Sequence, residues 1–113
     1  MSKLEETLQS YREAAIGHAD PDPAKANVWH GRLHACYKVL RETEEGRKAI
    51  ASLMADADPR VRGWAAAHCL QWFPKSARVV LEELRDEDVP WQVSFDAEMT
   101  LKEYDKGRLT FDY

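Results

Sequence analysis

The chain has 113 residues, enough for one small domain with one core and too few for a separate cofactor-binding module. Hydrophobic residues make up 44% and charged residues 32% of the sequence, a composition that excludes disorder of the whole chain. The net charge of −4 disfavours general nucleic-acid binding, which usually requires a basic surplus on one face.

The first residues and the cysteines indicate in which cellular compartment the protein is expected. Residues 1–6 lack a basic stretch followed by an apolar run, so we read no secretory signal, and no later window has membrane-spanning length. We therefore expect a cytoplasmic protein with no membrane contact. In the reducing cytosol, Cys36 and Cys69 are expected to be two buried thiols and not a disulfide.

Apolar spacing predicts two helices in the first 40 residues. Positions 4, 8, 11 and 15 form one apolar stripe, and the helix that carries it is expected to stop at Gly17. Asp22 then predicts a helix N-cap, and Pro23 fits the first helical position, where its missing N–H costs nothing. The second helix carries an apolar stripe at positions 29, 33, 36 and 40.

Two further helices are predicted in the middle of the chain. A short one passes through residues 49–54 and stops at the polar residues 56–58. Asp58 and Pro59 repeat the cap-plus-proline start, and the helix that follows is apolar almost all round up to Phe73, so it belongs at the centre of the domain. Pro74 is expected to end it, because proline disfavours helical geometry in the preceding residue.

The last part of the chain has one clear helix and one ambiguous segment. The fifth helix carries an apolar face that comprises Ala77, Val80, Leu81 and Leu84. Residues 91–101 alternate between apolar and polar side chains, which is typical of a strand. The sequence offers no second strand to pair with it, and a lone strand would leave its backbone groups unsatisfied.

An internal repeat decides this segment in favour of a helix. A shift of about 31 residues aligns Pro59 with Pro90 and Trp64 with Phe95, and a period in this range is typical of repeats built from helix pairs. We therefore predict a sixth helix and an all-α fold. Gly107 suits its left-handed end.

Four segments of the sequence carry a resemblance to known families. Residues 56–67, which contain Asp-Pro-Arg-Val-Arg, resemble the core of a HEAT or armadillo-type repeat. With residues 27–40, 96–101 and 107–109, the chain also resembles the bacterial family of domains of unknown function numbered two thousand and nineteen. The resemblance covers residues 20–110.

The resemblance implies a short α-α superhelix of about six helices that acts as an interaction module without catalytic activity. It implies one HEAT-like domain over residues 1–113, with an N-terminal helix in 1–19, repeats in 20–106 and a tail in 107–113. Small proteins of this kind include immunity partners of toxins and scaffolds. The last repeat departs from the pattern, because Trp91-Gln92-Val93 stands where Val-Arg is expected.

The leading functional hypothesis is a non-enzymatic module that binds another protein, of unknown identity, with the oligomeric state left open. Trp91 lies at a helix start outside the repeat pattern, so we expect it on an exposed binding surface. Arg60 and Arg78 are further candidates for partner binding.

Other prominent residues are expected to be structural. Asp58 and Pro59 start a helix, and Arg62 is expected to reach an aspartate in a neighbouring turn, either Asp86 or Asp88. Asp88 is also expected to cap the sixth helix. Three tryptophans are expected in the core: Trp29, Trp64 and Trp72.

Two alternatives stay open. His30 and His34 share one helix face, and together with Cys36 and with His68 and Cys69 from a neighbouring helix they could form a metal site. The histidine pair lacks properly spaced further ligands, so we predict no bound metal, no cofactor and no catalytic residues. The second alternative is nucleic-acid binding by a basic face that comprises Arg60, Arg62, Lys75, Arg78 and Arg85.

Overall fold

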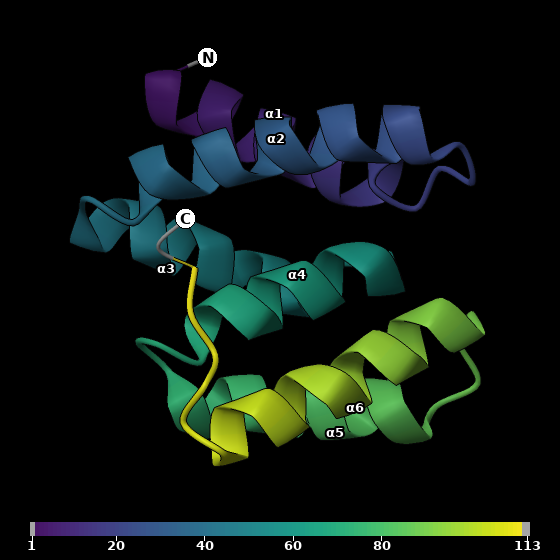
Figure 1. Cartoon of the computed structure of the whole chain (residues 1–113). Coiled ribbons are helices and arrows are strands. Elements are labelled where there is room, and N and C mark those ends of the chain that lie inside the picture. Colours follow the sequence, from purple (N-terminus) through teal and green to yellow (C-terminus); the bar gives the residue numbers. More distant parts are fainter. Residues whose placement is uncertain (1, 112–113) are drawn as a thin grey trace. The chain divides into compact units, whose positions relative to one another are not determined.

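The computed structural model describes residues 2–111, which contain six α-helices, one 3-10 turn and no β-strand. The elements are α1 (Lys3–Gly17), α2 (Pro23–Leu40), α3 (Glu44–Ser52), η1 (Leu53–Ala55), α4 (Pro59–Cys69), α5 (Pro74–Asp86) and α6 (Trp91–Asp105) (Figure 1). The predicted all-α fold is confirmed, and the ambiguous residues 91–101 lie inside α6.

The chain divides into two compact units, which meet in sequence between Leu53 and Met54. The first unit contains α1, α2 and α3, and the second contains α4, α5 and α6. The single HEAT-like domain over residues 1–113 stays a prediction.

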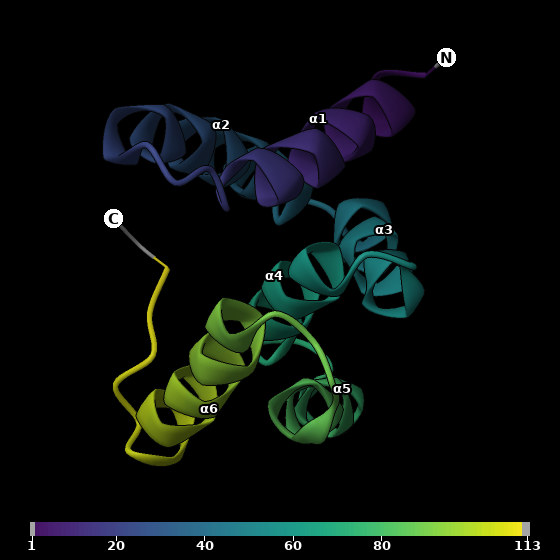
Figure 2. The ribbon, with the colours of Figure 1, turned by 90° about the vertical axis from the view of Figure 1, so that its right-hand side faces the viewer.

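In the first unit, α1 and α2 run antiparallel side by side, and α3 packs against both (Figures 1 and 2). Tyr11 of α1, Tyr37 of α2 and Ile50 of α3 are fully buried, each with 0% of its surface exposed. Burying an apolar side chain such as Ile50 contributes about 1.5–3 kcal/mol. Tyr11 belongs to the apolar stripe predicted for its helix, whereas Tyr37 lies outside the stripe predicted for α2. The predicted stop of α1 at Gly17 is confirmed.

In the second unit, α4 packs against both α5 and α6. Ala65, Ala66 and Cys69 of α4 are fully buried, and small side chains of this kind allow neighbouring helices to approach closely. The buried faces of α5 and α6 contribute larger apolar side chains, including Leu84 of α5 and Leu101 of α6. Six residues of α4 are buried, more than in α5 or in α6, and the place of this helix at the centre of the whole domain stays a prediction.

Side-chain caps start several helices as the sequence predicts. The Asp22 carboxylate accepts a hydrogen bond from the Ala24 N–H at 3.0 Å, and that of Asp58 accepts one from the Arg60 N–H at 2.9 Å. Thr43, which the periodicity did not reveal, caps α3 by accepting a hydrogen bond from the Gly46 N–H at 2.9 Å. These caps satisfy N–H groups that the helices leave without internal partners.

Two predicted helix boundaries are wrong. The fourth helix ends at Cys69 and not at Pro74, and Pro74 is instead the first residue of α5. Asp88 does not cap α6, because Pro90 occupies the N-cap position and no side chain caps that helix. The two repeats are therefore offset by one residue at their starts, since Pro59 lies inside α4 whereas Pro90 precedes α6.

The C-terminal segment after α6 folds back onto its own unit (Figure 1). Gly107 has a φ of +70°, the left-handed conformation predicted for it, and this conformation favours glycine. Phe111 then packs edge-on against His68 of α4, with ring centroids 4.7 Å apart. This contact covers His68, which is 1% exposed.

The prediction that the tryptophans form the core is wrong, because Trp29, Trp64 and Trp72 are each only partly buried. The fully buried large side chains are instead tyrosines, leucines and isoleucine, with His68 among them. An indole is wide and carries an N–H that needs a partner, so it is seldom covered on every side in so small a protein.

Candidate functional site

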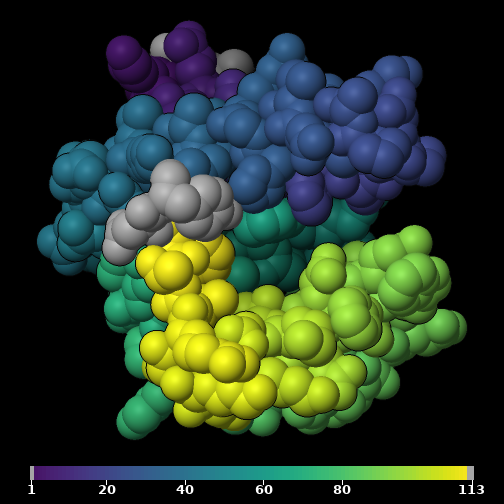
Figure 3. Space-filling view, in the orientation of Figure 1, coloured from purple at the N-terminus to yellow at the C-terminus, as the bar shows by residue number. Residues whose placement is uncertain are grey.

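The outer face of α6 carries an exposed apolar stripe, which we call the α6 stripe. It consists of Trp91, Phe95 and Met99, with 69%, 49% and 38% of their surfaces exposed. The three residues lie four positions apart and therefore share one helix face. Figure 3 shows α6 and the segment after it, in yellow-green to yellow, spread across the surface of the second unit.

Within the α6 stripe, the aromatic rings of Trp91 and Phe95 contact each other. Their centroids are 6.2 Å apart in an edge-to-face arrangement, which aromatic pairs prefer. The pair holds a large apolar surface toward solvent in a defined geometry. Trp91 therefore lies on the surface, where the sequence placed it, and Phe95 and Met99 extend the patch.

Arg60 and Arg78, the other candidates for partner binding, are both paired with carboxylates. Arg60 binds Asp58 through two hydrogen bonds, of 3.0 Å to Oδ1 and 2.7 Å to Oδ2. Arg78 of α5 binds both oxygens of Asp105 of α6, at 2.7 and 3.1 Å. These hydrogen bonds raise the pKa of each arginine and lower the pKa of Asp105. Both arginines therefore make structural contacts within the second unit.

The predicted basic face is neutralised by similar pairs. Arg85 pairs with Asp86 at 3.0 Å, and Arg62 lies 3.5 Å from Glu87. Among the five residues proposed for a nucleic-acid face, Lys75 alone makes no ion pair within the described part of the chain. A cation that is already paired with a carboxylate is less available to bind a phosphate.

Arg62 has a structural position, but its partner differs from the prediction. It pairs with Glu87, the residue between the two predicted aspartates. The reason is local: α5 ends at Asp86, whose carboxylate is held by Arg85, and Glu87 follows as the C-cap. The Arg62 Nε is buried and has no hydrogen-bond partner among residues 2–111.

The histidines of the first unit form a row that includes one residue the sequence did not single out. His30 and His34 stack with ring centroids 6.3 Å apart, and His18 lies 5.5 Å from His30. Burial lowers the pKa of His30, and the neighbouring His18 and His34 lower it further. A His pair at this spacing was predictable, whereas His18 is brought in by the turn between α1 and α2.

The cysteines do not extend this row into a metal site. Across residues 2–111, no group of three or more His, Cys, Asp and Glu side chains is arranged to hold a metal ion. Both cysteines are free thiols, and Cys69 is buried as predicted, whereas the prediction that Cys36 is buried is wrong, because it is only partly buried. Burial raises the pKa of Cys36 and raises that of Cys69 to about 12, so both remain protonated at neutral pH. The thiolate form that binds metals and attacks substrates is thereby disfavoured.

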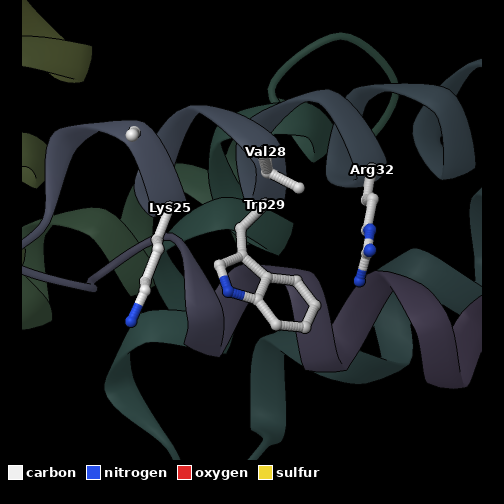
Figure 4. A pocket seen from close by; sticks show the side chains of 5 residues that line it. Lys25, Val28, Trp29 and Arg32 are labelled. Carbon is white, nitrogen blue, oxygen red and sulfur yellow. The ribbon is translucent and has the colours of Figure 1, made fainter.

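A pocket that the sequence did not reveal lies on the first half of α2. This Trp29 pocket has a volume of about 300 Å³ and is lined by Ala24, Lys25, Val28, Trp29 and Arg32. Figure 4 shows the indole of Trp29 between Lys25 on one side and Arg32 on the other, with Val28 beside it. Two cations spaced seven residues apart around an aromatic residue were the available signal, but the apolar stripe predicts Trp29 in the core instead.

Within residues 2–111, no helix is both long and apolar enough to span a bilayer. No known protein family matches the chain, and neither a curated protein nor a solved structure matches it.

Proposed function

We propose that this protein is a non-enzymatic helical module that binds another protein through the α6 stripe. The observation that carries the proposal is the exposure of Trp91 and Phe95, two large aromatic side chains on one helix face. Tryptophan and other aromatic residues are enriched among the residues that dominate protein–protein binding energy.

The geometry of the stripe suits it to this role. Trp91 and Phe95 contact each other before any partner binds, so little side-chain freedom is lost on association. Met99 continues the same face and offers a flexible apolar side chain that adapts to a partner's shape. Exposed apolar side chains gathered in one patch are typical of interaction sites.

The finer features of the proposal follow from the resemblance to HEAT-like repeats. In this proposal the helices form a short α-α superhelix, and the protein acts in the cytoplasm as an immunity-type or scaffold protein. The pairing of α5 with α6 by Arg78 and Asp105 supports the stacking of helices that such a repeat requires.

Site-specific photo-crosslinking tests this function. A photoreactive amino acid placed at Gln92, an exposed position beside the stripe, is expected to capture one partner protein in cells of the source organism. The double variant Trp91→Ala/Phe95→Ala is expected to lose the product. Val79→Ala, which removes an exposed apolar side chain from α5, is the control and is expected to retain it. An unchanged product in the double variant would contradict the proposal.

A further inference from the structure

We propose that the Trp29 pocket binds an acidic peptide segment in which two carboxylates flank an apolar side chain. The site lies entirely on α2, in the first unit, whereas the α6 stripe belongs to the second. The inference therefore stands or fails independently of the proposed role of the α6 stripe.

The floor of the pocket is held in place by α1. A Cβ atom added to Gly17 would fall on the indole of Trp29, 2.5 Å from Cε2 and 2.6 Å from Cγ. The ring therefore lies directly on the backbone of Gly17 and could not do so with any other residue there. One face of the indole is thus fixed against α1, and the part of the ring that Arg32 does not cover forms an apolar shelf beside Val28.

The cations beside this shelf have no carboxylate partners. The Cζ atom of Arg32 lies 4.8 Å from the centroid of the Trp29 ring, which orients the guanidinium by a cation–π contact. Neither Arg32 nor Lys25 makes a hydrogen bond or ion pair with another residue of the described chain. The nearest acidic residue along the sequence, Asp22, is engaged with the Ala24 N–H as the helix cap.

The lack of a carboxylate partner sets Arg32 apart from several other arginines of the molecule. The chain has 20 acidic and 16 basic residues, so carboxylates are abundant. Arginines elsewhere are bound to them at short distances: Arg60, Arg78, Arg85 and Arg108. Arg32 instead keeps its N–H donors available beside an apolar surface, an arrangement that matches a ligand carrying both a carboxylate and an apolar group.

The spacing of the cations selects a peptide over a small ion. Lys25 and Arg32 lie seven residues apart, about 10 Å along the helix axis. In Figure 4 their side chains lie on opposite sides of the indole, so a ligand that engages both must extend across Trp29. In an extended peptide, residues one, three and five share a face and span about 13 Å. An acid–x–apolar–x–acid segment therefore places one carboxylate near each cation and its central side chain on Trp29.

Fluorescence anisotropy with a defined probe tests the inference. The probe is a fluorescein-labelled peptide of sequence Gly-Glu-Ser-Phe-Ser-Glu-Gly, titrated with the full-length protein at low salt. We expect saturable binding that weakens with added salt, because exposed ion pairs are screened. Two control peptides, one with both glutamates replaced by glutamine and one with phenylalanine replaced by serine, are expected to bind at least about tenfold more weakly.

Variants of the protein locate the site. Arg32→Gln and Lys25→Gln are each expected to weaken binding about tenfold, the effect of losing a charge-assisted hydrogen bond. Lys38→Gln is the matched control, because it removes the same charge from an exposed position on α2 outside the pocket, and it is expected to change the affinity less than twofold. The indole N–H resonance of Trp29 is expected to shift as the peptide binds.

Four results would overturn the inference. They are no binding at millimolar protein, an equal loss of affinity in Lys38→Gln, full competition by inorganic phosphate at concentrations equal to that of the peptide, and tighter binding of single-stranded oligothymidine than of the peptide. The third result would assign the pocket to small anions, and the fourth to nucleic acid. None of them would bear on the crosslinking result at Gln92.

Discussion

At the scale of single residues, two glycines on adjacent helices have opposite roles. Gly17 lies under the Trp29 ring, whereas a Cβ atom on Gly31 would meet nothing within 4 Å. We expect Gly17→Ala to lower the free energy of unfolding by about 1–3 kcal/mol, because the indole must move. Gly31→Ala should raise it by roughly 0.5–1 kcal/mol, since alanine favours the helix.

Urea unfolding followed by circular dichroism measures both variants. Because they make the same chemical change, the difference between them reports the contact with Trp29. Equal effects of the two substitutions would show that Gly17 does not seat the indole, and the apolar shelf of the Trp29 pocket would then have no support.

His30 gives a residue-scale prediction about pH. Burial lowers its pKa below the ordinary value of 6.5, and His18 and His34 lower it further. Below pH 6.5 the unfolded chain therefore binds this proton more readily than the folded one, so the free energy of unfolding falls as the pH drops from 6.5 through the folded pKa.

A titration by NMR checks this prediction. The ring resonance of His30 is expected to have its midpoint below 6.5. In His34→Gln the midpoint should rise, because one of the two neighbouring positive charges has been removed. A midpoint at or above 6.5 in the unchanged protein would show that His30 is neither desolvated nor coupled to its neighbours.

At the scale of helices, α4 and α6 place their tryptophans differently. Trp64 of α4 is partly buried and packs near His68, with ring centroids 5.7 Å apart, whereas Trp91 of α6 is 69% exposed. We expect Trp64→Ala to cost about 2–3 kcal/mol of stability, less than a fully buried tryptophan would. Trp91→Ala should cost no more than about 0.5 kcal/mol.

Thermal and chemical unfolding of these two variants separates binding surface from core. If Trp91→Ala destabilises the protein as much as Trp64→Ala does, Trp91 covers the end of the helical stack as a terminal repeat must. The α6 stripe would then lose its main residue as a docking surface.

At the scale of the whole molecule, charge argues against nucleic acid as the partner. The net charge is −4, and four arginines of the predicted basic face are paired with carboxylates of their own unit. We expect no binding of duplex DNA at micromolar protein in 50 mM salt, conditions under which basic proteins bind strongly. Anisotropy of a labelled duplex measures it, and micromolar binding with a steep salt dependence would restore the basic-face alternative.

Local signals in the sequence determined the helical character of the chain. Asp22 and Asp58 are caps because a carboxylate beside the first turn can reach a free N–H, and Pro23 and Pro59 follow because a first helical residue needs no N–H. The alternation in residues 91–101 misleads, because packing of Ala97 and Leu101 decides which face is buried while Phe95 and Met99 remain exposed.

Tertiary structure alone decided which side chains meet. Gly17 and Trp29 belong to different helices, so no periodicity could show that the indole of Trp29 packs on Gly17. Because of this contact, Trp29, which was predicted in the core, instead lines a pocket. The same holds for Arg78, a candidate for partner binding until α5 and α6 place Asp105 beside it. Spacing along the chain shows which residues share a helix face. Contacts between helices depend on how those faces pack, and the packing determines which cations have carboxylate partners and which do not.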